Sequence, residues 1–323
     1  MKRKTIVIFG ISSFVGSSLA HYLKEDYKII GTYFENKVNI PGVLTLPCDV
    51  MKKEAIQMIL FTFRPELTIY AVGCSSVEAC HEFENYADAL NSGGLYNVVP
   101  FCERYQSKVC YISSAFIFSG ENQDNQENDT PLPNTVYGKS KASAEFFIQK
   151  SCLNYMIFRC CNFYGRGINP RFPSWFEVIE KKSFNQETFG MDSKIHIGFL
   201  DSYYLAEAIK ISFENDVTNR LFQLSSKDAL TYYDFVQAYS KVFKTDKSLV
   251  KKINWEFPQL ESSVIEQRLD DNFYYKLDVT NLESALGFDL PSVEESLNFS
   301  FQMLGGGKKL SGGKKKSTEI NYI

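Results

Sequence analysis

Short apolar runs alternate with segments of helical periodicity over the first half of the chain, and this alternation constrains the fold most strongly. The apolar runs have strand length and fall at residues 5–9, 27–33, 43–48, 67–72 and 108–112. Apolar residues at helical spacing occupy the intervals at 17–24, 54–63 and about 86–104. This order is typical of βαβ units, so the sequence predicts an α/β fold with a doubly wound parallel sheet.

The alternation becomes looser after about residue 165. Residues 166–194 are mixed and aromatic-rich, whereas later segments again resemble strands followed by helices. A chain of 323 residues has room for two domains. We therefore expect three regions: a first domain over 1–165 with returning segments near 195–225, a smaller and mostly C-terminal α/β lobe over 166–304, and a flexible basic tail over 305–323.

Composition excludes several classes of protein. The net charge is −3 and the pI is about 5.8, and five lysines are confined to the tail, so a nucleic-acid-binding body is not expected. No apolar run reaches the 18 or so residues of a membrane span. Eight cysteines form no C-x-x-C pair and the three histidines are far apart, so no metal site is predicted. We expect reduced, buried thiols in a cytoplasmic protein.

A glycine turn follows the first strand. Gly10 and Gly16 stand in a G-x-x-G-x-x-G frame whose middle position is Ser13. A dinucleotide pyrophosphate requires a tight turn, a close backbone approach and helix N–H groups directed at its charge. The turn therefore predicts a Rossmann-like cofactor site at the start of the first helix.

The end of the second strand bears on the choice between NADP and NAD. NAD sites usually place an acid there to bind the ribose hydroxyl, and here the strand ends at Thr32-Tyr33-Phe34. The missing acid favours NADP and leaves NAD as the alternative, and Tyr33 is placed among the cofactor-binding residues.

Tyr137 and Lys141 are four residues apart and therefore share a helical face. An adjacent ammonium is expected to lower the pKa of the phenol, which then donates a proton to a carbonyl oxygen while a hydride reaches its carbon. Ser114 closes the fifth strand 23 residues earlier, at the sheet edge where such folds bind ligands. A second pair with this spacing, Tyr33 and Lys37, has no serine partner and is interpreted as a loop pair.

Together these residues resemble the extended short-chain dehydrogenase/reductases, and within them the dTDP-4-dehydrorhamnose reductases and related nucleotide-sugar enzymes. Residues 77–82 are similar to the reductase stretch DVDxCE and residues 111–120 to ISTDYVFDG. Residues 197–209 resemble a further family segment, and residues 159–165 are similar to the RxxNxYG of sugar epimerases and dehydratases. The resemblance implies a nucleotide-sugar substrate and a homodimer formed through the helices that flank the active site.

The resemblance also assigns roles to individual residues. It implies Ser114, Tyr137, Lys141 and Asn91 as the catalytic residues, with Asn91 at a helix bend that organises a proton-relay water. The implied cofactor contacts are Gly10, Ser13, Phe14, Val15, Gly16, Tyr33, Asp49, Val50, Ala71, Gly73, Tyr137 and Lys141. The implied substrate contacts are Ser75, Ser114 and Asn162.

Three departures leave the reaction open. Ala115 replaces the acid that follows the catalytic Ser/Thr in the reductases. Val72-Gly73 stands where the reductases usually have a second alanine and an aromatic residue, and Asn162 follows the epimerase pattern. We expect an NAD(P)H-dependent reductase of a 4-keto nucleotide-sugar, in deoxysugar or surface-polysaccharide synthesis. The alternatives are a 4-epimerase, a dehydratase and a non-catalytic dinucleotide-binding regulatory subunit. The dehydratase ranks last, because Ala115-Phe116 lacks the acid pair that dehydratases of this kind carry after the catalytic Ser/Thr.

Overall fold

A seven-stranded sheet forms the centre of the computed structural model, which describes residues 3–168, 173–255 and 272–305. The strand order is β11-β6-β5-β4-β1-β2-β3, and every neighbouring pair is parallel. The strands are β1 (Thr5–Phe9), β2 (Lys28–Tyr33), β3 (Leu44–Pro47), β4 (Leu67–Tyr70), β5 (Lys108–Ser114), β6 (Tyr155–Cys160) and β11 (Arg220–Leu224). The predicted doubly wound parallel sheet is confirmed.

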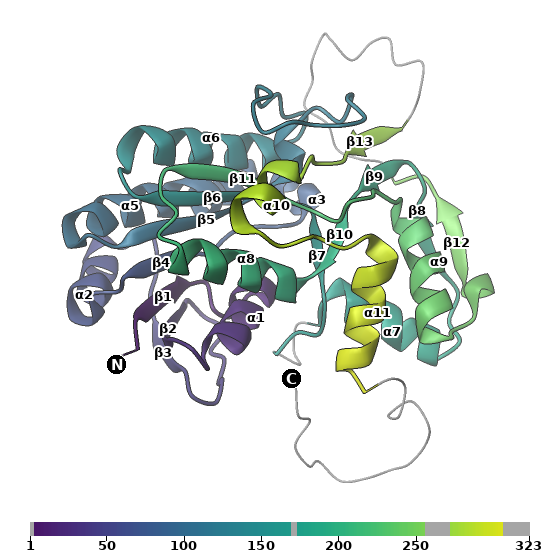
Figure 1. The fold of residues 1–323 in the computed structure, drawn as a ribbon, viewed down its shortest axis with the longest axis horizontal. Coiled ribbons are helices and arrows are strands. Elements are labelled where there is room, and N and C mark those ends of the chain that lie inside the picture. Colours follow the sequence, from purple (N-terminus) through teal and green to yellow (C-terminus); the bar gives the residue numbers. More distant parts are fainter. Residues whose placement is uncertain (1–2, 169–172, 256–271, 306–323) are drawn as a thin grey trace.

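Helices cover both faces of this sheet (Figure 1). One face carries α1 (Phe14–Leu23), α8 (Ser202–Glu214) and α10 (Thr280–Leu286). The other face carries α2 (Lys53–Phe63), α5 (Gly94–Tyr105) and α6 (Val136–Ser151). The central strands are buried on both sides, which explains why β1, β4 and β5 read as continuous apolar runs rather than as alternating patterns.

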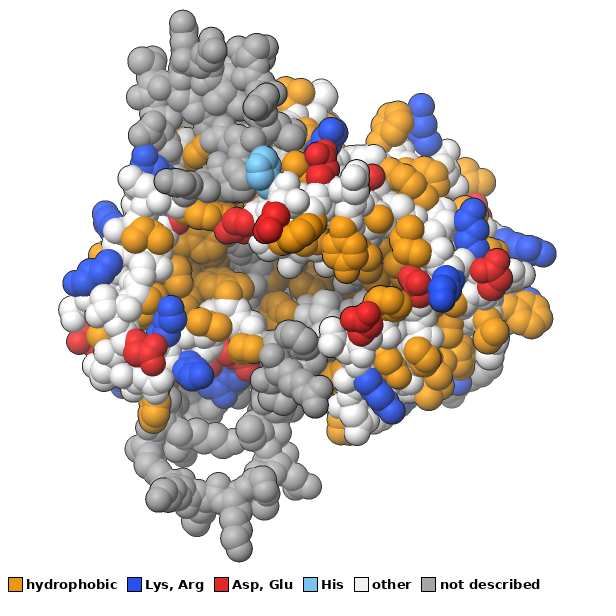
Figure 2. All heavy atoms as spheres, turned by 180° about the vertical axis from the view of Figure 1, so that it is seen from behind, with side chains coloured by type: hydrophobic (Ala, Val, Ile, Leu, Met, Phe, Trp, Pro, Cys, Tyr) orange, Lys and Arg blue, Asp and Glu red, His pale blue; other side chains and the backbone are white. Residues whose placement is uncertain are grey.

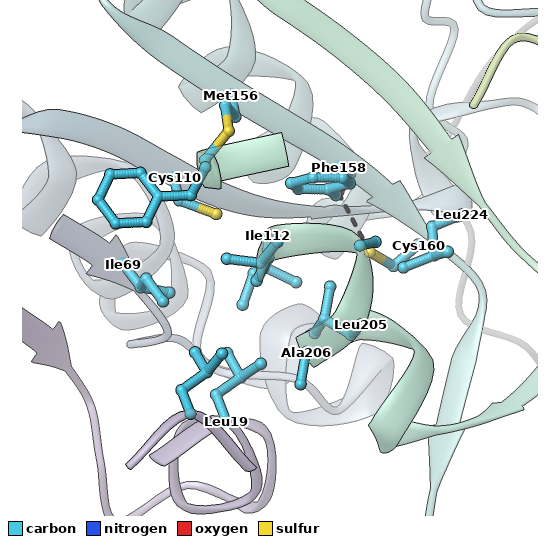
Figure 3. Packing of buried hydrophobic residues seen from close by; sticks show 14 of the residues in the cluster. Leu19, Ile69, Cys110, Ile112, Met156, Phe158, Cys160, Leu205, Ala206 and Leu224 are labelled. Carbon is cyan, nitrogen blue, oxygen red and sulfur yellow. Dashed lines mark hydrogen bonds between the residues drawn. The ribbon is translucent and has the colours of Figure 1, made fainter. Parts of the chain in front are cut away.

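The core beneath α1 and α8 is built from residues distant in sequence. Figure 3 shows Leu19 of α1 and Leu205 of α8 facing Ile69, Ile112 and Phe158 on three neighbouring strands. All five side chains are at most 9% exposed, so helix and sheet pack without intervening solvent.

Most of the remaining elements form a second lobe at one end of the sheet (Figure 1). Three two-stranded parallel sheets pair β7 with β10, β8 with β12 and β9 with β13. Their strands are β7 (Asn162–Tyr164), β8 (Phe189–Asp192), β9 (Ile195–Ile197), β10 (Phe199–Asp201), β12 (Val250–Ile253) and β13 (Phe273–Tyr275). The helices here are α7 (Trp175–Phe184), α9 (Tyr232–Phe243), α11 (Val293–Met303) and the 3₁₀ turn η3 (Lys247–Leu249).

The second half contributes to both parts of the molecule. Strand β11 and helix α8 lie within the returning segment expected near 195–225, whereas α10 joins the same sheet layer from outside it. The division at residue 165 stays a prediction, and the tail beyond residue 305 lies outside the described residues. Within the described ranges, no helix is long and apolar enough to cross a membrane.

One predicted helix is interrupted. The segment expected as a helix near 86–104 begins with α4 (Glu84–Asp88), continues through the π-helical turn η1 (Ala89–Gly93) and ends in α5. A further short helix, α3 (Val77–Glu82), precedes it. A π-turn inserts an extra residue and often occurs at functional sites, and this one contains Asn91.

Candidate active site

A cavity of about 560 Å³ lies at the carboxyl ends of the central strands. The chain order of the sheet reverses between β1 and β4, and ligands of doubly wound folds bind at such a reversal. Figure 2 shows that this face of the molecule is hollowed between its two halves, with hydrophobic side chains gathered on the walls. Of the predicted site residues, the cavity is lined by Ser13, Phe14, Val15, Ala71, Gly73, Ser75, Ser114, Tyr137, Lys141 and Asn162.

The turn after β1 forms one wall of the cavity and depends on Gly10. This residue has a φ of +87°, and a Cβ placed on it would lie 2.6 Å from the carbonyl oxygen of Ala71. Only glycine accepts both the left-handed backbone and this approach to the end of β4. Ser13 then caps α1, since its Oγ accepts a hydrogen bond from the Gly16 N–H at 3.0 Å and donates one to the Gly10 carbonyl at 2.8 Å.

These residues suit an anionic dinucleotide. The N-terminus of α1 adjoins the cavity through Phe14 and Val15, and unpaired helix N–H groups attract phosphate charge. Ala71 and Gly73 line the cavity next to this turn, and Ser13 Oγ lies 3.3 Å from the Ala71 carbonyl oxygen. The donor set of this chain therefore fits a dinucleotide cofactor.

Three of the predicted cofactor contacts, Tyr33, Asp49 and Val50, lie at the same sheet edge but do not line this cavity. Tyr33 ends β2 and packs partly buried against the α1 side of the core. Asp49 accepts a hydrogen bond from the Met51 N–H at 2.9 Å, and Val50 is buried against Gly94. Their contact with a cofactor stays a prediction.

The predicted serine, tyrosine and lysine meet at the cavity. Ser114 is the last residue of β5, and its side chain hydrogen-bonds that of Tyr137 in the first turn of α6. Lys141 lies one helical turn later, with Nζ 5.8 Å from the centre of the Tyr137 ring. This ammonium donates a hydrogen bond of 2.9 Å to the backbone carbonyl of Ile112 on β5, which fixes it beside the phenol.

A close helix approach makes this arrangement possible. Thr135 caps α6 by accepting a hydrogen bond of 3.0 Å from the Gly138 N–H. Gly138 also passes so near the Phe116 carbonyl that a Cβ there would overlap it. The absence of a side chain at Gly138 therefore lets the first turn of α6 bring Tyr137 against the end of β5.

Burial determines the charge of these two groups. It raises the pKa of the Tyr137 phenol well above its usual value, and the hydrogen bond with Ser114 only partly offsets this. The pKa of the phenol is thus raised, opposite to the depression expected from Lys141, and removal from solvent is the largest cause. Burial also lowers the pKa of Lys141 to about 8, with the acidic groups around it acting in the opposite direction.

Asn91 joins the π-turn to two parts of the cavity wall. Its Oδ1 accepts a hydrogen bond from the Cys74 N–H at 2.9 Å, and its Nδ2 donates to the Cys74 carbonyl at 3.2 Å and to Ser140 Oγ at 2.9 Å. The side chain is fully buried and is absent from the cavity lining. Asn91 therefore positions the loop after β4 relative to α6, and its role with a proton-relay water stays a prediction.

The second lobe supplies two residues of the cavity, Trp175 and Tyr232, that were not predicted from the sequence. Asn162 of β7 donates a hydrogen bond of 2.5 Å to the hydroxyl of Tyr232 at the start of α9. Trp175 also lines the cavity, and its Nε1 donates to the Phe163 carbonyl at 3.0 Å. The signal at Trp175 was the aromatic-rich stretch after residue 165, whereas Tyr232 reaches the cavity only through tertiary packing.

A parallel sheet of this order, with a serine, a tyrosine and a lysine at its reversal point, has the arrangement of a short-chain dehydrogenase/reductase. The sequence model of the family described as RmlD substrate binding domain matches residues 3–304, so the chain belongs to this family.

Individual relatives are distant but extend over most of the chain. A probable low-salt glycan biosynthesis reductase of Haloferax volcanii is 22% identical over 301 residues, which cover 90% of this chain and 95% of that protein. Methionine adenosyltransferase 2 subunit beta of Rattus norvegicus is 22% identical over 241 residues, or 73% of this chain and 70% of that protein. A dTDP-4-dehydrorhamnose reductase of Bacillus anthracis, solved in complex with NADP, superposes with a TM-score of 0.77 at 18% identity, covering 94% of this chain and 99% of that one.

Proposed function

We propose that this chain is an NAD(P)H-dependent reductase of a 4-keto nucleotide-sugar, acting in deoxysugar or surface-polysaccharide synthesis. The observation that carries the proposal is the hydrogen-bonded Ser114 and Tyr137 with Lys141 beside them, in a cavity at the reversal point of the sheet. Family membership and a glycan biosynthesis reductase among the relatives support it.

Tyr137 is the proton donor in this proposal. Reduction of a ketone leaves an alkoxide, which is a stronger base than a phenolate and takes the phenol proton. The raised pKa of Tyr137 keeps the phenol protonated at neutral pH, which is the form that a reduction requires. Ser114 hydrogen-bonds the same phenol and, from its place in the cavity, orients the substrate carbonyl. A bound nicotinamide supplies the hydride.

The cofactor is held between the α1 turn and the end of β4. Gly10, Ser13 and Gly16 shape the turn, and the neighbouring helix N-terminus attracts the pyrophosphate. Lys141 is close enough to Tyr137 to bind the ribose that carries the nicotinamide. NADP is preferred over NAD, because β2 ends at Tyr33 without an acid for the ribose hydroxyl.

An assay of the purified protein tests the reaction. The protein is incubated with NADPH or NADH and a panel of 4-keto nucleotide-sugars while the absorbance of the reduced nicotinamide is followed. Stoichiometric oxidation with at least one sugar is the expected result, with kcat/KM higher for NADPH. Isomerised sugar without net oxidation identifies an epimerase instead, and neither product from any sugar contradicts the proposed enzyme.

The pH dependence follows from Lys141. We expect kcat/KM to be constant near neutrality and to fall about tenfold per pH unit above about pH 8, because the ammonium loses its proton as pH rises through its lowered pKa. Tyr137 stays protonated over this range because its own pKa is raised. The profile of kcat/KM for the reduced cofactor, which reports groups of the free protein, measures this. A profile that stays flat up to about pH 10 would show that a charged Lys141 is not required.

Two other functions have a specific observation in their favour. Asn162 in the RxxNxYG pattern lines the cavity and supports a 4-epimerase. The relative from Rattus norvegicus, named as subunit beta of methionine adenosyltransferase 2, supports a non-catalytic dinucleotide-binding subunit. The presence of Ser114, Tyr137 and Lys141 together weighs against the second, since a binding subunit has no need of a positioned proton donor.

We also propose a cytoplasmic location and a homodimer. All eight cysteines are free and seven are buried, as expected for a reducing compartment. The proposed dimer uses the helices that flank the active site, and α6 carries Phe146 with 61% of its surface exposed.

A further inference from the structure

Cys74 differs from the other cysteines of this chain. It follows β4 in the loop that forms one wall of the cavity, and it is partly exposed, whereas the other seven thiols are buried. Cys160 and Cys161 also line the cavity but are at most 6% exposed, so Cys74 is the most accessible of its three cysteines. Reactive thiols are those that combine access with a stabilised thiolate, and the surroundings of Cys74 provide the second condition as well.

A second cysteine, Cys80, lies next to Cys74. It lies in α3 with no exposed surface, and its Sγ donates to the Cys74 carbonyl at 3.5 Å. The two side chains also lie close enough for each thiol to shift the pKa of the other. Both pack against one small cluster that includes Val136, next to Tyr137. Two thiols six residues apart are thus in contact at the edge of the proposed active site.

The pKa values of the two thiols are shifted in opposite directions. The neighbouring Cys80 thiol lowers the pKa of Cys74, whereas Cys74 and burial raise the pKa of Cys80. Asn91 holds both cysteines in place. It hydrogen-bonds the backbone N–H and the backbone carbonyl of Cys74, and Asn91 Nδ2 lies 4.0 Å from Cys80 Sγ. Cys74 is therefore suited to attack, and Cys80 to follow as its partner.

We propose that Cys74 and Cys80 form a covalent modification site that reacts with hydrogen peroxide and becomes a reversible disulfide. The Cys74 thiolate attacks a peroxide oxygen, which breaks the O–O bond, gives the sulfenic acid and releases the other oxygen as water after protonation. Cys80 Sγ then attacks the sulfenic sulfur, the S–O bond breaks and a second water leaves. The two thiols lose two electrons and two hydrogens, and the peroxide is reduced to two waters.

The disulfide alters the wall of the cavity. Cys74 is adjacent to Gly73, and a Cβ at Gly73 would already overlap Asn91 Oδ1, so the loop has no spare room toward the π-turn. A bond to Cys80 draws the Cys74 side chain toward α3 and disturbs the hydrogen bonds that hold the loop to Asn91. Reactivity of the pair stands independently of the proposed function, whereas a loss of turnover on oxidation rests on it.

The first test uses the reduced full chain without cofactor or sugar. Iodoacetamide is expected to alkylate Cys74 at least about tenfold faster than any other cysteine, as read by peptide mass spectrometry. Hydrogen peroxide is expected to remove the mass of two hydrogens and to link the peptides of residues 74 and 80. Cys48→Ser is the matched control, because Cys48 is buried away from the cavity and its loss should change neither result.

The single variants separate the two steps. In Cys80→Ser, peroxide should leave a sulfenic acid at Cys74 that dimedone traps, and in Cys74→Ser no such adduct should form at Cys80. Alkylation of Cys74 no faster than that of the buried thiols, or a disulfide to any cysteine other than Cys80, would overturn the proposal. Turnover is measured last, and dithiothreitol should restore it in oxidised wild type but have no effect on Cys80→Ser treated with dimedone. Because alkylation and mass are read without turnover, failure of the proposed reductase activity leaves these results interpretable.

Discussion

Replacement of Tyr137 by Phe is expected to lower kcat by about 10²–10⁴-fold, because it removes the group positioned to protonate the reduced carbonyl. The ring, its packing against Phe116 and the fold remain, since only one hydroxyl is lost. Binding of reduced cofactor should be nearly unchanged. The measurement is single-turnover oxidation of NADPH with the best sugar of the panel, together with fluorescence titration of the cofactor.

Tyr111→Phe is the matched control for this variant. Tyr111 is fully buried on β5, its ring centre is 5.1 Å from Lys141 Nζ, and its hydroxyl has no hydrogen-bond partner among the described residues. Loss of that hydroxyl should leave kcat unchanged and the free energy of unfolding equal or slightly higher, because an unpaired buried polar atom is removed. If Tyr137→Phe retains the activity of Tyr111→Phe, Tyr137 is not the proton donor.

Replacement of Glu145 by Ala is expected to lower the free energy of unfolding by about 3–5 kcal/mol. Glu145 lies on α6 two turns after Tyr137 and accepts hydrogen bonds from Arg159 Nε at 3.1 Å and Nη2 at 2.9 Å. Both side chains are at most 4% exposed, so the variant leaves a guanidinium buried without its counter-charge. Urea unfolding followed by circular dichroism measures the change.

An exposed ion pair provides the comparison. Lys241 and Glu294 are 2.6 Å apart but 59% and 50% exposed, so Glu294→Ala should cost less than about 1 kcal/mol. Equal costs for the two variants would mean that burial of the Glu145 pair does not determine its contribution. If only Glu145→Ala lowers the free energy of unfolding strongly, the Glu145–Arg159 pair holds α6 against strand β6. The same helix carries Tyr137 and Lys141.

The sheet and the turn after β1 were predictable because their signals are local. Four apolar residues after Thr5 in β1, a glycine turn and a capped helix follow one another within about 20 residues, and backbone sterics decide their conformation. Tyr137 and Lys141 were predictable for the same reason, since a spacing of four residues defines one helical face.

The environment of these residues was not predictable in the same way. The pKa of Tyr137 moves opposite to the expectation, and its largest cause is burial, which is a property of the whole fold. Tyr232 reaches the cavity from α9, some 70 residues beyond Asn162, and no local pattern marks it. The π-turn at Asn91 depends on contacts with Cys74 and Ser140 that lie on other elements.

The last strand of the sheet also bears on how the polypeptide reaches its folded state. Strand β11 pairs with β6 only after about 60 further residues of the second lobe have been added to the chain, and α10 covers it later still. During synthesis from the N-terminus, β6 therefore remains an unpaired apolar edge, the kind of surface on which chains aggregate. The central sheet is therefore completed only after residues 161–219 have been synthesised, so its last strand depends on a segment that also carries β7 to β10.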